Sequence, residues 1–344
     1  MSHVFIALSG GVDSSVAASL LRQEGHDLSA VHLQLLGCPS HDAEDARRAA
    51  EQLGIPFHLL DLSGPFRETV LRSFVETYQQ GGTPNPCVVC NRTIKFGALL
   101  DWVLDQGGDA LATGHYARLE QDPTSGRFLL KRAVDRKKDQ SYFLYTLNQK
   151  QLSHIRFPLG ELEKPQVRVL AEESALVTAS KRDSQDICFV SNGAYASFID
   201  EFTGTPSPTG PFLDQEGKVL GQHKGFIRYT KGQHKGLGLS TETPLYVLDK
   251  DPETCAIQLG PDSALWESSC TVESLNWISI PALDAPREVS VKTRYSQREA
   301  QARIEPLPDG RVRVLFQEPQ RAITPGQSAV FYDGDLVVGG GILC

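Results

Sequence analysis

The first apolar run of the chain breaks at a pair of glycines. Residues 4–8 are apolar, Gly10 and Gly11 follow, and a helical pattern then extends from Ser14 to Glu24. This order predicts a strand, a tight turn and a helix that Gly25 terminates. Both glycines can adopt a positive φ, which would point the amide groups of the turn into one concavity beside the positive end of the helix. The segment therefore predicts an anion site, and phosphate is its natural ligand.

The hydrophobic pattern that follows alternates between strands and helices. Strands are expected at 28–35, 57–62 and 109–113, and a charged amphipathic helix at 42–53. Such alternation predicts an α/β domain with a doubly wound parallel sheet, whose ligands lie beyond the carboxyl ends of the strands. Gly114 lies at such a strand end.

The pattern changes from about Pro206 to short strand-sized pieces separated by glycine and proline. From Val289 apolar and polar residues alternate, so that Val289, Val291, Thr293 and Tyr295 fall on one face and Lys292 and Arg294 on the other. Short strands at 312–316, 329–332 and 336–338 complete a small antiparallel barrel. The sequence thus predicts three domains: an α/β domain at 1–200, a small central mixed domain at 201–265 and a β-barrel at 266–344.

Composition narrows the class of protein. The 344 residues are 40% hydrophobic and 22% charged, which is typical of globular proteins, and the net charge of −8 argues against a protein that coats nucleic acid indiscriminately. The sequence has no run of 18 apolar residues, and its start lacks a basic n-region, so we expect a cytoplasmic protein with no membrane partner. Seven cysteines, an odd number, then favour thiols for catalysis or metal binding over a disulfide framework.

Two cysteine segments are candidates for chemistry. In T-P-N-P-C-V-V-C-N at 83–91, the two prolines predict a loop that carries Cys87 and Cys90. Cys188 follows Lys181 and Arg182, and cationic neighbours would lower the pKa of its thiol, as a sulfur nucleophile requires. A buried core cysteine is the alternative for Cys188.

Other positions allow two interpretations. His115 is either a neighbour of phosphate or ribose, or a structural histidine, and the structural role is favoured. Lys138, Asp139 and Gln140 form either a solvated surface turn, which composition favours, or a contact to a nucleic-acid backbone. Leu33, at the end of the second strand, is either a core residue or a neighbour of a nucleotide base.

The glycine loop fits neither of the two common nucleotide motifs. No lysine follows its glycines as in a Walker loop, and the G-x-G-x-x-G spacing is absent. S-G-G-V-D-S-S instead resembles the loop of the ATP pyrophosphatase (PP-loop) superfamily. Further motifs follow the loop in this order: T-P-N-P-C-x-x-C-N, A-T-G-H-Y at 112–116, K-D-Q-S-Y-F-L at 138–144, D-I-C-F at 186–189, Y-T-x-G-Q at 229–233, K-T-R-Y at 292–295 and T-P-G-Q-x-A-V-F-Y at 324–332. With these motifs, the whole chain resembles the bacterial tRNA-specific 2-thiouridylases.

The resemblance implies a fold like that of adenine nucleotide α-hydrolases and a site for ATP with Mg²⁺. The nucleotide would contact the loop and two strand ends: Ala7, Leu8, Ser9, Gly10, Gly11, Val12, Asp13, Ser14, Leu33 and Gly114. Asp13 would position Mg²⁺ or the loop. ATP would adenylate the 2-oxygen of the wobble uridine, a persulfide on Cys188 would deliver sulfur to C2, and Cys90 would be the partner thiol.

The resemblance also implies partners. Asn85, Pro86 and Cys87 would contact a flipped-out target base. Lys138, Asp139, Gln140, Arg294 and Tyr295 would contact the tRNA, with lysine, glutamate and glutamine tRNAs as acceptors. A cysteine desulfurase or a sulfur carrier would supply the sulfur.

One departure from the family leaves the sulfur chemistry open. Many members carry aspartate where this chain has Cys87, so Cys87, Cys90 and Cys188 are either a persulfide site with one spectator thiol or the ligands of an iron–sulfur cluster. Zinc would require a fourth protein ligand. Two other functions compete: a PP-loop ligase or amidotransferase acting on a small metabolite, and a non-catalytic tRNA-binding protein. The ligase would leave the paired cysteines and the terminal barrel unused.

Overall fold

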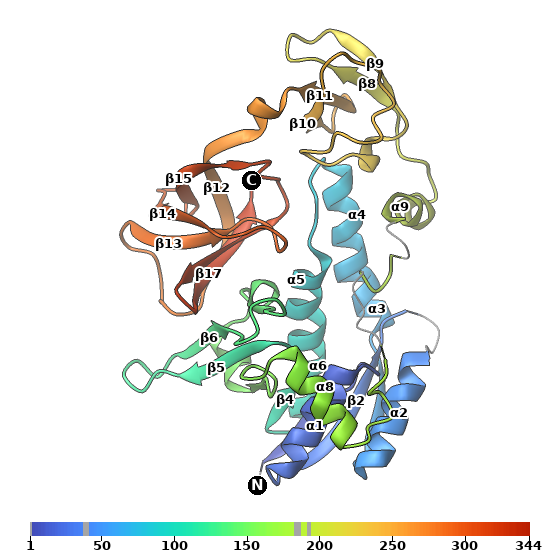
Figure 1. Ribbon diagram of the computed structural model, residues 1–344, viewed down its shortest axis with the longest axis vertical. Helices are drawn as coiled ribbons and strands as arrows, with labels where there is room; N and C mark the ends of the chain where they lie inside the picture. Colours follow the sequence, from blue (N-terminus) through green and yellow to red (C-terminus); the bar gives the residue numbers. More distant parts are fainter. Residues whose placement is uncertain (1, 37–40, 182–186, 191–193) are drawn as a thin grey trace.

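The computed structural model describes residues 2–36, 41–181, 187–190 and 194–344. Its N-terminal part is built on a five-stranded parallel sheet in the order β3-β2-β1-β4-β7 (Figure 1). The strands are β1 (His3–Ala7), β2 (Asp27–Gln34), β3 (Phe57–Asp61), β4 (Ala110–Ala112) and β7 (Ile155–Arg156). Strand order reverses direction at β1, so the crevice between β1 and β4 is where such a sheet binds ligands. The expected doubly wound α/β fold is confirmed.

Helices cover both faces of this sheet because neighbouring strand residues point to opposite sides. Val4 and Ile6 of β1 pack with one group of helices, α1 (Val12–Gln23), α2 (His41–Leu53) and α8 (Lys164–Glu173). Phe5 lies in the core on the other face, with residues of α6 (Leu99–Asp105). A short helix, α7 (Gln149–Ser153), precedes β7.

Two long helical segments extend from the sheet towards the central domain (Figure 1). One runs through α3 (Ser63–Phe66), a π-helical segment at Arg67–Leu71, and α4 (Arg72–Gln79). The other runs through α5 (Pro86–Cys90), a π-helical segment at Asn91–Ala98, and α6. The prediction of a loop throughout 83–91 is therefore wrong. Pro86 occupies the first turn of α5, where the missing N–H costs nothing and the fixed φ suits a helix.

The central domain is a small mixed sheet in the order β10-β11-β8-β9. Its strands are β8 (Gly210–Leu213), β9 (Val219–His223), β10 (Tyr246–Asp251) and β11 (Ala256–Gly260), and only the β11–β8 pair is parallel. The preceding helix α9 (Tyr195–Thr203) lies against α4, where the rings of Tyr195 and Tyr78 stack with centroids 4.8 Å apart.

The C-terminal part is a closed antiparallel barrel of six strands, as expected. These are β12 (Trp266–Trp277), β13 (Arg287–Lys292), β14 (Ala300–Pro306), β15 (Val312–Arg321), β16 (Ser328–Asp333) and β17 (Leu336–Leu343). They follow the order β12-β15-β14-β13-β16-β17, and pairing of β17 with β12 closes the sheet. Val289 and Val291 point into its core as the alternation predicts.

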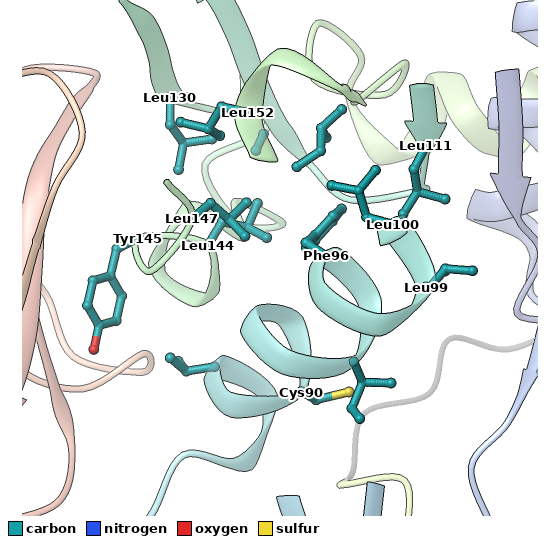
Figure 2. Packing of buried hydrophobic residues seen from close by; sticks show 14 of the residues in the cluster. Cys90, Phe96, Leu99, Leu100, Leu111, Leu130, Leu144, Tyr145, Leu147 and Leu152 are labelled. Carbon is teal, nitrogen blue, oxygen red and sulfur yellow. The ribbon is translucent and has the colours of Figure 1, made fainter. Parts of the chain in front are cut away.

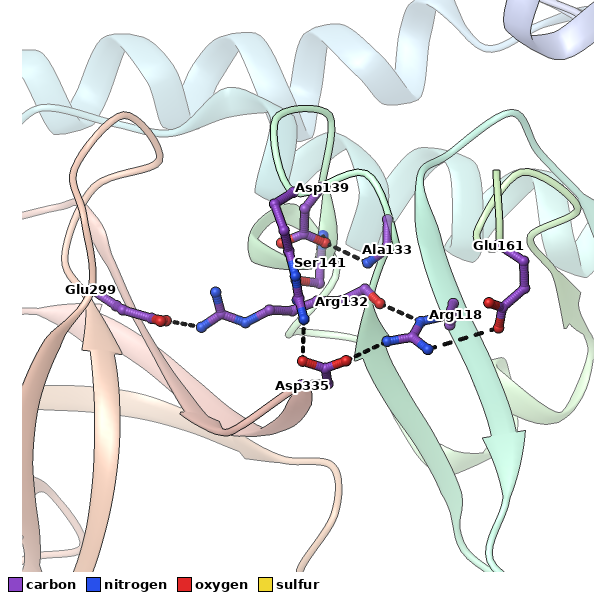
Figure 3. Close-up of polar contacts among 9 residues, drawn as sticks. Arg118, Arg132, Ala133, Asp139, Ser141, Glu161, Glu299 and Asp335 are labelled. Atoms are coloured by element: carbon purple, nitrogen blue, oxygen red, sulfur yellow. Dashed lines mark hydrogen bonds and ion pairs between the residues drawn. The ribbon is translucent and has the colours of Figure 1, made fainter. Parts of the chain in front are cut away.

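A hairpin of the N-terminal part extends the barrel sheet. β6 (Phe128–Arg132), which pairs with β5 (Ala117–Gln121), also pairs with β17 at Lys131 and Leu336. Asp335 accepts hydrogen bonds from Arg118, at 2.5 Å, and from Arg136 (Figure 3). Figure 2 shows the shared core beside this junction, from which Tyr145 reaches towards the barrel; its hydroxyl donates to the Gly341 carbonyl at 3.2 Å. The two parts are thus one continuous structure.

None of the helices in the described ranges has the length and apolar character needed to span a membrane.

Candidate active site

The glycine loop between β1 and α1 has one residue that requires glycine. Gly10 has φ +76°, and a Cβ there would lie 2.3 Å from the carbonyl oxygen of Asp42. Gly11, in contrast, is extended, with φ −100°, and forms the N-cap of α1. The prediction of a positive φ is confirmed for Gly10 and wrong for Gly11, because only the first residue turns the chain.

The first turn of α1 keeps its amide groups available. Ser14 and Ser15 donate their hydroxyls to the Gly11 carbonyl at 3.1 Å instead of capping the helix, and among the described residues no side chain caps the N–H groups of α1. Uncapped amides at the positive end of a helix bind anions. The geometry supports the phosphate site that the sequence predicts.

Gly114 follows β4 and lies against this turn. A Cβ on Gly114 would be 2.8 Å from the Ser14 nitrogen and 2.9 Å from the Asp13 carbonyl carbon. The first turn of α1 therefore packs directly on the backbone of Gly114, and the expected contact of Gly114 with a nucleotide stays a prediction. Leu33, at the end of β2, is partly buried against the core on the α6 face of the sheet.

Asp13 is held by two residues distant in sequence. Its Oδ1 accepts a hydrogen bond from the Tyr116 hydroxyl at 2.8 Å and from the Lys164 ammonium at 2.7 Å. Lys164 lies at the start of α8, so the fold brings its positive charge to the phosphate loop. In a Walker motif, a lysine of the loop itself supplies this charge. The sequence analysis missed Lys164, since no local pattern connects it with Asp13.

The structure brings the three candidate thiols together. Cys87 and Cys90 lie one turn apart on α5, and the segment of Cys188 is anchored by Phe189, whose ring packs on Phe74 of α4 with centroids 5.1 Å apart. Burial raises the pKa of Cys90 to about 11, and the thiols of Cys188 and Cys87 contribute to that rise. The three sulfur atoms are therefore within electrostatic range of one another.

Lys181, one of the two upstream cations predicted to activate Cys188, pairs with other groups. The Lys181 ammonium binds the carboxylates of Asp42, at 2.6 Å, and Asp45, at 2.7 Å. Arg182 lies outside the described residues. Cys188 and Cys87 are exposed, yet partial desolvation of the sulfur raises the pKa of each thiol.

Lys95 is the cation that acts on the thiols. Its charge lowers the pKa values of Cys87, Cys90 and Cys188, opposing the larger effect of burial. It lies five residues beyond Cys90 in the π-helical segment, where i→i+5 bonding makes five residues about one turn. No local pattern in the sequence singles out Lys95, because the π-helical segment that carries it lacks the regular period of an α-helix.

Substitution of Lys95 by methionine should make Cys87 and Cys188 less reactive. Without the ammonium their thiolates are less stable, so both pKa values rise and the thiolate fraction at a given pH falls. We expect the rate of alkylation by iodoacetamide at pH 8 to fall by about three- to tenfold. Lys95→Arg keeps the charge and serves as the control, and Cys344 of the same protein is the internal reference. Identical pH profiles for Lys95→Met and wild type would contradict this role.

His115 has the surroundings of a structural histidine. It is buried, its Nδ1 is 2.7 Å from the Thr113 hydroxyl, and its ring contacts those of Phe96 and Phe157. Burial holds the pKa of His115 well below its usual value, and the charge of Lys95 lowers it further. The imidazole is neutral, and it connects the Lys95 region with the strand end at Gly114.

The segment at 138–140 is not a solvated turn. Asp139 is only 6% exposed and accepts hydrogen bonds from the Ala133 amide at 3.0 Å and the Ser141 hydroxyl at 2.9 Å. Gln140 accepts from the Tyr116 amide at 2.9 Å. Interpretation as a surface turn is wrong, because the adjoining Ser141 and Tyr142 are fully buried beneath the barrel. Lys138 is half-buried.

The remaining predicted contacts lie where the barrel meets this segment. The ring of Tyr295 is 37% exposed and lies 4.4 Å from that of Phe143. The Lys292 ammonium lies 5.0 Å from the Tyr295 ring, although the predicted alternation places these two side chains on opposite faces. The alternation fails at Tyr295 because β13 ends at Lys292. Arg294 points inward and donates to the carbonyls of Lys231, at 3.2 Å, and Ala322, at 3.0 Å.

The expected contacts to a base begin at Asn85, which precedes α5 as its N-cap. The side chain of Asn85 lies near the Tyr142 hydroxyl and lowers its pKa, opposing the larger effect of burial. Pro86 is buried and Cys87 is exposed. Over the ranges that the structure covers, no three histidine, cysteine, aspartate or glutamate side chains are arranged to hold a single metal ion.

Comparison with known proteins accounts for the whole length of the chain. Residues 2–192 match the family described as the tRNA methyl transferase HUP domain, 196–261 its PRC-barrel domain and 267–343 the aminomethyltransferase beta-barrel domain. A tRNA-specific 2-thiouridylase MnmA from Acetivibrio thermocellus is 46% identical over 353 residues, which cover 99% of this chain and 98% of the relative.

Further relatives carry the same description. The MnmA of Clostridioides difficile is 44% identical over 99% of this chain and 97% of its own length, and that of a Synechococcus strain is 45% identical over 100% and 97%. The family descriptions refer to methyl transfer, whereas the relatives are described as thiouridylases. A cluster of three thiols suits sulfur transfer and has no evident use in methyl transfer. The chain belongs to the tRNA-specific 2-thiouridylase family.

Proposed function

We propose that this protein replaces the 2-oxygen of the wobble uridine in tRNA by sulfur, at the expense of ATP. The observation that carries the proposal is the meeting of Cys87, Cys90 and Cys188 beside Lys95. The site lies close to the nucleotide loop, because Lys95 acts on His115 and the adjoining Gly114 packs on the first turn of α1. A ligase for small metabolites would need the loop and would have no use for the thiols.

The reaction requires two activations. The uridine 2-oxygen attacks the α-phosphorus of ATP, pyrophosphate leaves, and the oxygen becomes part of an AMP leaving group. The terminal sulfur of a persulfide on Cys188 then attacks C2 and AMP departs. The Cys90 thiolate attacks the Cys188 sulfur, which breaks the S–S bond to the transferred atom and leaves 2-thiouridine and a Cys90–Cys188 disulfide. A dithiol reductant restores the two thiols.

The nucleotide loop supplies the binding site for the triphosphate. The uncapped amides of α1 and the Lys164 ammonium would neutralise the phosphates. Mg²⁺ commonly binds nucleotide phosphates with one or two protein carboxylates. Asp13 is the carboxylate in the right place for that role, although its Oδ1 already accepts from Lys164 and Tyr116. Leu33 would lie against the adenine.

The tRNA would lie across the junction of the barrel with the N-terminal part, at Lys138, Gln140 and the exposed ring of Tyr295. Asp139 and Arg294 contribute by holding that surface in place, since Asp139 accepts from the Ala133 amide and Nη2 of Arg294 donates to the Ala322 carbonyl. Asn85, Pro86 and Cys87 would contact the flipped-out base. Acceptors would be the lysine, glutamate and glutamine tRNAs, and a cysteine desulfurase or a sulfur carrier would load Cys188 in the cytoplasm, where such tRNAs are modified.

The third thiol supports one alternative for the sulfur step. Cys87 raises the pKa values of both Cys90 and Cys188, so the three thiols lie within electrostatic range of one another. In the structure the three cysteines are not arranged to hold a metal ion, so an iron–sulfur cluster in place of a persulfide would require their side chains to move together. Anaerobic purification with iron analysis separates the two: iron-free protein that remains active excludes the cluster.

The function is tested with purified protein, ATP, a persulfide-generating desulfurase with cysteine, and a transcript of lysine tRNA. Nucleoside mass spectrometry should detect 2-thiouridine only when ATP is present, together with one AMP per modified base. Formation of 2-thiouridine without ATP would overturn the proposal. Release of pyrophosphate without tRNA would instead favour a metabolite ligase.

A further inference from the structure

The loop before α5 is attached to the C-terminal barrel. The Thr83 amide donates to the Pro325 carbonyl at 2.9 Å. In return, the Gln327 side chain donates from Nε2 to the carbonyls of Thr83, at 2.8 Å, and Pro84, at 3.2 Å. Thr83 and Pro84 lead directly into the helix of Cys87 and Cys90, whereas Pro325 and Gln327 lie between β15 and β16 of the barrel.

Close backbone packing accompanies these hydrogen bonds. Gly326 has φ +83°, and a Cβ there would lie 2.7 Å from the Thr77 methyl group and 3.3 Å from the Thr83 nitrogen. A Cβ on Gly82 would lie 3.1 Å from the Pro325 carbonyl oxygen. The two segments touch without room for another side chain, so their relative position is fixed within narrow limits.

A second connection reaches the same helix start. The Tyr142 hydroxyl donates to the Ser328 carbonyl at 2.9 Å, and the Asn85 side chain lies close enough to that hydroxyl to lower its pKa against the larger effect of burial. Asn85 is the N-cap residue of α5. Ser328 is the neighbour of Gln327, so one stretch of the barrel contacts Thr83 and Pro84 directly and approaches Asn85 through Tyr142.

Gln327 is the side chain best placed to set the position of this loop. Carbonyl groups in an irregular segment need donors, and Pro84 and Pro86 supply no amide hydrogen. The amide of Gln327 provides one donor group to two successive carbonyls. Its removal would leave both oxygens without this donor and loosen the loop, which the hydrogen bond from the Thr83 amide to the Pro325 carbonyl would still attach to the barrel.

We propose that Gln327 is a positioning residue for sulfur transfer, which holds the start of α5 so that Cys87 and Cys90 face Cys188. The inference rests on the proposed function. The barrel thereby determines the geometry of the thiol site, in addition to any contact that it makes with tRNA. A thiol displaced by about 1 Å from the line of attack loses as much as a hundredfold in rate.

The test compares Gln327→Ala with Gln301→Ala in the full-length protein. Gln301 is an exposed barrel glutamine whose Nε2 donates to the Ser290 hydroxyl at 2.9 Å, far from the loop, so its loss controls for removal of a barrel amide. We expect Gln327→Ala to lower kcat for thiolation by at least about tenfold, with KM for tRNA changed by less than about twofold. Gln301→Ala should match the wild type in both.

A second measurement needs no substrate. In Gln327→Ala the rate of alkylation at Cys87 should change by threefold or more, while Cys255, in the turn between β10 and β11 of the central domain, keeps its rate. An unchanged rate at Cys87, or a parallel rise at both cysteines, would overturn the proposal, the latter because it indicates general destabilisation. If the wild type fails to thiolate tRNA, the proposed function fails, and the alkylation rates still decide whether Gln327 positions the loop.

Discussion

Replacement of Cys188 by serine is expected to abolish 2-thiouridine formation while ATP-dependent adenylation of tRNA continues. A hydroxyl cannot carry a sulfane sulfur, and no other thiol in the site can both hold the sulfur and release it. The loss should exceed about a thousandfold, as for other nucleophiles. The measurement is nucleoside mass spectrometry alongside pyrophosphate release, with Cys255→Ser as the control because Cys255 belongs to the turn between β10 and β11 of the central domain.

Two further variants divide the possible outcomes. In Cys90→Ser, Cys188 should still be loaded with sulfur. Turnover should stop, because the partner thiol that attacks Cys188 is missing. Cys87→Ser should retain activity if persulfide chemistry operates and lose it together with iron if a cluster is present. Normal thiolation by Cys188→Ser in cells would show that the sulfur takes another route.

Gly10→Ala is expected to abolish ATP binding and to lower stability. The positive φ at Gly10 costs a residue with a Cβ about 1–2 kcal/mol, and that Cβ would lie 2.3 Å from a backbone oxygen at the start of α2. The turn must therefore move, and the amides of α1 move with it. We expect ATP affinity to fall by at least about tenfold and the Tm by about 2–4 °C for each kcal/mol lost.

Gly11→Ala is the matched comparison for stability. Gly11 has φ −100°, and its added Cβ would meet only the Ser9 hydroxyl oxygen, at 3.5 Å. Its Tm should stay within about 1 °C of the wild type, as should that of Gly64→Ala, where a Cβ would meet nothing within 4 Å. Equal Tm values and equal ATP affinity for Gly10→Ala and the wild type would contradict the assigned role of the turn.

Much of the N-terminal fold is predictable because its signals are local. The strand expected at 57–62 is β3 (Phe57–Asp61), and the helix expected at 42–53 is α2 (His41–Leu53). Gly25 ends the first helix, with φ +82°, as its position predicts. Alternation and glycine caps are properties of a few neighbouring residues, so they survive without knowledge of tertiary contacts.

The site depends on contacts that local patterns do not contain. Lys164 donates to Asp13 although the two residues are far apart in the sequence. Lys181 forms an ion pair with Asp42 of α2 and does not act on Cys188. Tyr142 is fully buried although basic and polar residues precede it, since the barrel covers it. Pro84 and Pro86 predict irregular backbone because of their conformational preferences. Pro86 nevertheless begins a helix, because its fixed φ is compatible with the first turn of α5.

The shared sheet of β6 and β17 has a consequence for how the protein is made. While the ribosome synthesises the chain, β6 emerges long before β17, and until β17 arrives its edge and the nearby tyrosines lack a cover. Such an edge invites pairing with other chains. Maturation of the nucleotide-binding half thus waits for the last strand, and nascent chains released early should be candidates for chaperone capture and proteolysis.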